Sequence, residues 1–155
     1  MISGGTTSYT VLIVDDDHRL LHLLTRGLEL LGHFKVARAE NGFEGLEQFF
    51  AVRPDCVVID VVMPGMNGNQ LVKALRGDPA SAATPLVLLT ALAQEKNQFA
   101  GLASGADCYL VKPVTPRELV STVQRVIMIS EAERTERLST LIKESDEFAY
   151  QLGSE

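Results

Sequence analysis

Acidic, hydroxyl and basic side chains stand at the ends of four apolar segments of this 155-residue chain. In chain order they are Asp15, Asp16, Asp60, Thr90 and Lys112. Carboxylates that are brought together repel one another, and a hard divalent cation such as Mg²⁺ relieves that repulsion because it takes oxygen ligands. A lysine ammonium and a threonine hydroxyl can both donate to phosphoryl oxygens. Gathered in one pocket, these side chains would suit a carboxylate that accepts a phosphoryl group.

The four apolar segments are near-continuous, which is typical of strands that are covered on both faces of a parallel sheet. A fifth candidate strand is interrupted by Lys35 and Arg38 and suits a sheet edge, where charge is tolerated. The predicted strands are Val11–Val14, Phe34–Ala39, Cys56–Ile59, Leu86–Leu89 and Tyr109–Val111.

Helical patterns separate the strands. Between Asp17 and Leu31, leucines recur at three- and four-residue spacing, with Asp17 as the expected N-cap and Gly32 as a C-terminal stop. The other predicted helices are Gly42–Phe50, Asn67–Leu75, Gln94–Ala103 and one that begins at Pro116 after an N-cap at Thr115.

Alternating strands and helices with right-handed crossovers predict an α/β fold, a doubly wound five-stranded parallel sheet with helices on both faces. Functional groups in such a sheet collect at the carboxyl ends of the strands. The polar residues that end the apolar segments are therefore expected to meet at one edge.

The composition is that of an ordinary globular domain, with 46% hydrophobic and 22% charged residues. Cys56 and Cys108 are expected to be reduced thiols that pack as small hydrophobes. The net charge of −6 argues against direct binding of nucleic acid. The sequence lacks a membrane-spanning run and a signal peptide, so we expect a cytoplasmic protein with no membrane contact.

Four segments carry a resemblance to a known family: VLIVDDD, VVIDVVMPGMNG, LVLLTA and ASGADCYLVKP. In their order and separations they resemble bacterial two-component response-regulator receiver domains of the chemotaxis-regulator type, over residues 9–130. The resemblance implies a flavodoxin-like sheet with strand order 2-1-3-4-5. We expect a flexible N-terminus at residues 1–8, before the matched region. It also implies a phosphoacceptor that signals and is not a turnover enzyme. Its partner would be a sensor histidine kinase or a histidine phosphotransfer protein.

The resemblance assigns roles by position. Asp60 matches the phosphoacceptor, and the implied ligands of Mg²⁺ (or Mn²⁺) are Asp15, Asp16, Asp60 and the backbone carbonyl of Val62. The residues that match phosphate contacts and the conformational switch are Thr90, Ala91, Lys112 and Tyr109. Pro113 would follow a cis peptide bond.

Val62 and Leu92 occupy two positions that tune dephosphorylation in that family. Both are apolar, so neither can orient an attacking water molecule. Ala91 is small and leaves the phosphoryl group reachable from outside. We therefore expect slow self-dephosphorylation.

The segment 131–155 changes character, with seven acidic and three basic residues. No glycine or proline interrupts residues 117–152, so the last helix could run on or a further helix could begin near Ser130. A sparse apolar stripe is formed by Leu138, Leu141, Ile142, Phe148 and Leu152. The segment could fold back on its own domain, fray, pair with a second copy, or lead as a linker into an unknown output domain.

The fourth predicted helix, the fifth strand and the fifth helix could also form a dimer interface.

Two other functional classes compete with a signalling receiver. A phosphohydrolase with an aspartyl-phosphate intermediate would want a second Asp two residues after the nucleophile, where Val62 stands. A flavin or nucleotide binder would want a Gly-rich or Ser/Thr-rich loop after the first strand, where three aspartates would repel phosphate.

Overall fold

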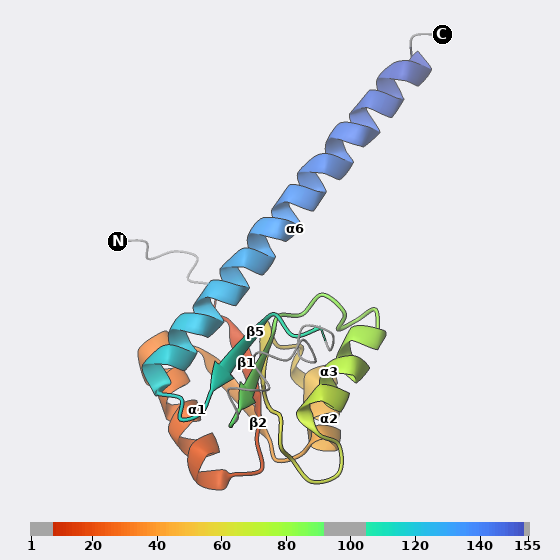
Figure 1. Ribbon diagram of the computed structural model, residues 1–155. Coiled ribbons are helices and arrows are strands. Elements are labelled where there is room, and N and C mark those ends of the chain that lie inside the picture. Colours follow the sequence, from red (N-terminus) through yellow and green to blue (C-terminus); the bar gives the residue numbers. More distant parts are fainter. Residues whose placement is uncertain (1–7, 92–104, 154–155) are drawn as a thin grey trace.

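Five parallel strands form a single sheet with the order β2-β1-β3-β4-β5 in the computed structural model, which describes residues 8–91 and 105–153 (Figure 1). The strands are β1 (Thr10–Val14), β2 (Lys35–Ala39), β3 (Cys56–Asp60), β4 (Leu86–Thr90) and β5 (Cys108–Val111). The predicted fold class and strand order are confirmed. β2, the strand with two basic side chains, lies at the sheet edge as predicted.

Apolar cores lie on both faces of the sheet. In β1, Val11 and Ile13 point into one core, whereas Leu12 and Val14 point into the other. The helices α1 (His18–Gly32) and α6 (Pro116–Gly153) cover the first face, and α2 (Gly42–Val52) and α3 (Gly68–Gly77) cover the second (Figure 1). Burial on both faces explains why the central strands are apolar at every position except at their ends.

At α1, the prediction for the start of the helix is confirmed, and the prediction for its end is wrong. The Asp17 carboxylate accepts the backbone N–H groups of Arg19 and Leu20 at 3.0 and 3.3 Å, so the predicted N-cap is confirmed. Gly32, the predicted stop, is instead the last helical residue, and His33 caps the helix with φ 56°. A Cβ atom at Gly32 would lie 2.5 Å from the Phe34 ring. Close packing, and not backbone freedom, explains this glycine.

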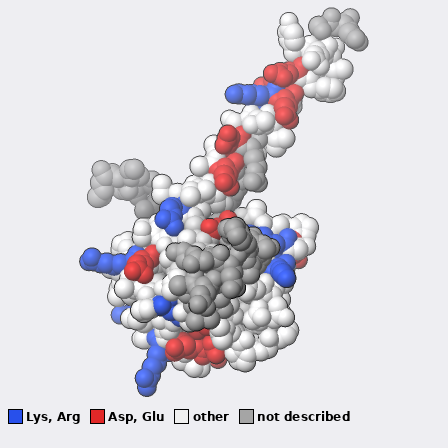
Figure 2. Space-filling view, viewed as in Figure 1, with Lys and Arg blue, Asp and Glu red and all other residues white. Residues whose placement is uncertain are grey.

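The last helix is continuous over 38 residues. Its first part packs on the sheet through Val120, Val123 and Ile127, which are buried. The later part projects away from the domain, and acidic side chains dominate its visible charge (Figures 1 and 2). The predicted helical extension is therefore confirmed as a prolongation of α6 that does not fold back on the domain.

Some sequence expectations concern residues outside the described ranges: the helix over 94–103, Leu92, and most of the N-terminal stretch 1–8. Within residues 8–91 and 105–153, no helix combines the length and the apolar character needed to cross a bilayer.

Arg76, near the end of α3, joins the loop before β4 to the start of β5. Its guanidinium donates four hydrogen bonds of 2.6–2.9 Å, to the carbonyl oxygens of Ala82, Thr84 and Gly105 and to the carboxylate of Asp107. The same Asp107 carboxylate accepts the backbone N–H of Leu86 at 2.7 Å. One ion pair thus fixes the entry of two strands whose other ends carry functional side chains.

Replacing Arg76 by methionine should lower the free energy of unfolding by about 2–4 kcal/mol, because three carbonyl groups and one carboxylate lose their donor. Urea denaturation measures this change. The control is Lys73→Met on the exposed side of α3, which should change the free energy by under about 0.5 kcal/mol. Equal stability of the two variants would contradict the role assigned to Arg76.

Candidate functional site

The carboxyl edge of the sheet gathers the polar residues that the sequence placed at strand ends. Asp15 directly follows β1, Asp60 ends β3, Thr90 ends β4 and Lys112 directly follows β5. Asp15, Asp60 and Thr90 are buried, with exposed fractions of 0%, 4% and 0%. Carboxylate oxygens of Asp15, Asp16 and Asp60, one from each residue, all lie within 4.8 Å of one another. Residues 45 positions apart therefore share one acidic pocket.

Lys112 supplies the positive charge of the pocket. Its ammonium nitrogen lies 3.0 Å from Oδ1 of Asp60 and 3.8 Å from Oδ2 of Asp15. The backbone N–H of Lys112 donates to the carbonyl of Thr90 at 2.7 Å, which fixes the lysine beside β4. The peptide bond between Lys112 and Pro113 is cis.

Asp15 is the most constrained of the carboxylates. One oxygen, Oδ1, accepts the backbone N–H of Asp17 at 2.9 Å, and within the described part of the chain Oδ2 has no hydrogen-bond donor. The pKa of Asp15 is raised to about 6, and burial is the largest cause. The charges of Asp60 and Asp16 also contribute to this rise, whereas the Asp17 N–H and the Lys112 ammonium act in the opposite direction.

This donor set fits a hard divalent cation. Among the described residues, the buried Oδ2 of Asp15 has no donor, and Lys112 brings one ammonium group against three carboxylates. Mg²⁺ prefers carboxylate oxygens and keeps several water molecules. A cation at this pocket would satisfy the free oxygen and offset the repulsion that raises the pKa of Asp15.

The loop between β3 and α3 folds closely over the end of β3. The backbone N–H of Gly68 donates to the carbonyl of Val61 at 2.9 Å, and a Cβ atom at Gly68 would overlap the carbonyl oxygen of Asp60. Only glycine therefore permits this close approach. Val62, two residues after Asp60, turns its side chain outward with 66% of it exposed.

The remaining predicted site residues are less closely gathered. Tyr109 lies half-buried in β5 and packs against the core shared with α2 and α3. Its hydroxyl is buried and has no hydrogen-bond partner within the described part of the chain. Ala91 is exposed directly after Thr90. Leu92 lies outside the described residues.

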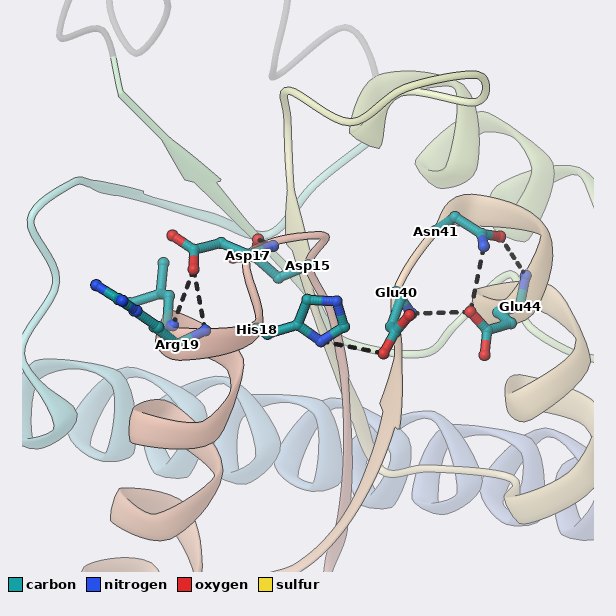
Figure 3. Close-up of polar contacts among 8 residues, drawn as sticks. Asp15, Asp17, His18, Arg19, Glu40, Asn41 and Glu44 are labelled. Atoms are coloured by element: carbon teal, nitrogen blue, oxygen red, sulfur yellow. Dashed lines mark hydrogen bonds and ion pairs between the residues drawn. The ribbon is translucent and has the colours of Figure 1, made fainter.

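Sequence reasoning missed a polar network beside the acidic pocket. At the start of α1, His18 points toward Glu40, which follows β2, and Nδ1 lies 3.2 Å from Oε1 of Glu40 (Figure 3). Glu44 accepts the backbone N–H of Glu40 and the side-chain amide of Asn41, both at 3.2 Å. The signal that could have found this network is the helix-start pattern Asn41-x-x-Glu44.

A family model described as the response regulator receiver domain matches residues 11–124. PilH of Pseudomonas aeruginosa is 39% identical over 117 residues, which cover 76% of this chain and 96% of PilH. The transcriptional regulatory protein PrrA of Mycobacterium tuberculosis is 43% identical over 123 residues, which cover 79% of this chain and 52% of PrrA. The chain thus spans about half the length of that regulator.

Solved structures are similar to this chain over nearly their whole length. A putative response regulator from Chloroflexus aurantiacus superposes with a TM-score of 0.73 at 37% identity, covering 79% of this chain and 99% of that one. The chemotaxis response regulator CheY4 of Vibrio cholerae superposes with a TM-score of 0.72 at 36% identity, covering 77% and 99%. In both comparisons about a fifth of this chain falls outside the match.

The raised pKa of Asp15 predicts a gain in stability when its charge is removed. Because the folded-state pKa is about 6 and the unfolded-state value is near 3.8, the metal-free protein loses stability as pH rises through this window. At pH 7 and in the presence of a chelator, Asp15→Asn should therefore raise the free energy of unfolding, by up to about 3 kcal/mol.

Urea denaturation at pH 4.5 and pH 7 tests this expectation, because the gain should shrink at the lower pH. Asp146→Asn, on the exposed part of α6, is the matched control and should change little at either pH. A destabilised Asp15→Asn protein at pH 7 would contradict the electrostatic account of the pocket.

Proposed function

This chain belongs to the response regulator receiver domain family, and from that premise we propose that Asp60 is its phosphoacceptor. One observation carries the proposal. The Asp60 carboxylate is buried beside two other carboxylates, with the Lys112 ammonium 3.0 Å away. A carboxylate in such a setting can act as a nucleophile toward phosphorus without a general base, because it has no proton to lose.

Phosphorylation is a transfer from a phosphohistidine of a cytoplasmic sensor histidine kinase or histidine phosphotransfer protein. An oxygen of Asp60 attacks the phosphorus atom, the P–N bond breaks, and the bond electrons and a proton from water restore the neutral imidazole. Lys112 offsets the negative charge on the transferring phosphoryl oxygens. Thr90 is the last residue of β4 and Ala91 follows it, so both lie at the same edge of the sheet. The chain thus promotes its own modification and has no separate substrate.

Asp15, Asp16, Asp60 and the backbone carbonyl of Val62 would hold Mg²⁺ (or Mn²⁺). When bound, the ion supplies positive charge that offsets both the carboxylates and the phosphoryl oxygens. The free oxygen of Asp15 and the raised pKa of that group support this assignment. Without a cation, a phosphoryl group would enter a pocket that already holds excess negative charge.

The modified state is expected to act through Thr90 and Tyr109. Burial of the Tyr109 hydroxyl without a hydrogen-bond partner among the described residues is unfavourable. This cost favours a change in the position of the ring when Thr90 moves toward the phosphoryl group. The face that responds would comprise β5, the first part of α6 and the fourth predicted helix, which lies outside the described residues. This face would bind an output domain, an output protein or a second copy. PrrA is called a transcriptional regulatory protein, but this chain is acidic and covers only half of PrrA, so its output is not direct DNA contact.

The two rival functions receive less support. An aspartyl-phosphate phosphohydrolase requires a second Asp two residues after the nucleophile, and Val62 with its exposed apolar side chain stands there. A nucleotide binder needs backbone N–H groups free for phosphate after β1, but the Asp17 N–H is taken by Asp15.

Incubation with Mg²⁺ and acetyl phosphate should add one phosphoryl group per chain, detected by intact mass. Asp60→Asn should abolish the addition, because an amide is a poor nucleophile and loses the charge that pairs with Lys112. Asp55→Asn, an exposed aspartate before the same strand, is the control and should still be labelled. Label that persists at position 60 in Asp60→Asn would refute the proposal.

The phosphorylated form should persist without a phosphatase, because the apolar Val62 side chain cannot orient an attacking water molecule. Val62→Ala should leave the decay rate within about twofold, whereas Val62→Asn should raise it by about tenfold or more. Loss of label from phosphorylated protein after removal of acetyl phosphate measures the rate. A lifetime of seconds at neutral pH, or faster decay in Val62→Ala, would contradict this expectation.

A further inference from the structure

The projecting part of α6 carries an apolar seam that nothing in the described chain covers. Leu138, Leu141, Phe148 and Leu152 are 59–62% exposed. Together with Ser145 they follow the alternating three- and four-residue spacing of a coiled coil, and none of these five positions is charged. Burial of these exposed apolar side chains against a second helix would be favourable, because it removes their apolar surface from water. The seam therefore calls for a second helix.

This seam lies on the same side of α6 as the domain. Leu138, Leu141 and Ser145 each stand 18 residues after a residue that packs into the core shared with α1, namely Val120, Val123 and Ile127. Eighteen residues make about five whole helical turns, so each pair points in the same direction. The face that binds the sheet thus continues beyond the domain as an exposed seam.

The domain that owns this helix cannot cover the seam. The hydroxyl of Tyr9 donates to Glu131 at 2.7 Å, and this bond marks the level at which α6 leaves the domain. Leu138 and Leu152 stand seven and 21 residues further on, about 10 and 30 Å along the straight helix. Within residues 8–91 and 105–153, no other element reaches this part of α6 (Figure 1).

We propose that the seam pairs two copies of this chain in an antiparallel coiled coil. A parallel second helix would need, at the level of Val120 and Ile127, the space that the first copy's own sheet fills. An antiparallel helix avoids that overlap because each domain sits at the opposite end of the pair. The seam is also self-complementary in this direction, since Leu141 faces the small Ser145 of the other copy and Leu138 faces Phe148.

A groove of about 580 Å³ lies at the base of the projecting helix and is lined in part by Tyr9, His33, Phe34, Ile127 and Met128. Met128 is 68% exposed there. In the antiparallel pair, the C-terminal end of the second helix, with Leu152, points toward this groove. The groove lies at the amino ends of the strands, opposite the edge that carries Asp60, so pairing leaves the acidic pocket accessible.

Sedimentation equilibrium from about 1 to about 200 µM tests the pairing. The 16.9 kDa chain should move to twice its mass with rising concentration. Leu141→Glu should weaken dimerisation at least tenfold, whereas Tyr150→Glu, at an exposed position off the seam, should leave it within about twofold. Circular dichroism verifies that both variants fold. A monomer throughout, or a dimer that Leu141→Glu does not weaken, would overturn the proposal.

Oxidative crosslinking in a Cys108→Ser background tests the orientation, because Cys56 is fully buried. Leu138→Cys mixed with Phe148→Cys should give crosslinked heterodimers, because these two positions face each other in the antiparallel pair. Leu138→Cys alone should not crosslink to itself, because the two copies of position 138 lie at opposite ends of the seam. Efficient crosslinking of Leu138→Cys alone would mean a parallel pair and would overturn the antiparallel arrangement.

Discussion

Repulsion among buried carboxylates at the carboxyl edge of the sheet is the interaction on which the functional part of this molecule depends. Asp15 and Asp60 are held out of water, with the Lys112 ammonium as the positive group that the described residues bring to them, and the pKa of Asp15 is raised to about 6. The folded state therefore carries an electrostatic penalty that a bound cation would relieve. The same excess of charge makes the pocket sensitive to any change in the charge of Asp60, as a signalling site requires.

The rest of the fold keeps that unfavourable cluster in place. Two apolar cores hold the central strands from both sides, so the ends of β1 and β3 cannot separate to relieve the repulsion. Arg76 and Asp107 anchor the opposite ends of β4 and β5. The electrostatic repulsion at the carboxyl edge of the sheet is thus offset by apolar burial in the two cores and by the Arg76–Asp107 ion pair.

The helix α6 joins two environments in one rigid element. Its first part belongs to the core, and its later part presents the same face to solvent. Because a straight helix transmits rotation along its axis, any movement of β5 or of the first turns of α6 would reorient the exposed seam. The edge of the sheet that carries the acidic pocket and the exposed seam of α6 are in this way mechanically linked, although they lie at opposite ends of the sheet.

The sequence by itself determined the α/β class, the buried strands and the identity of the pocket residues. Continuous apolar runs mark two-sided burial, and a polar residue at the end of such a run can lie only at a sheet edge. The Asp17 cap was equally predictable, since the capping bonds are local. Tertiary structure alone decided the reason for Gly32, the His18–Glu40 contact and the pKa of Asp15, because each depends on atoms distant in sequence. It also decided that α6 continues past Ser130, because the local sequence pattern is compatible with both a break and a continuation. Whether the apolar side chains beyond that point are covered or exposed likewise depends on which other elements lie beside them in the folded chain.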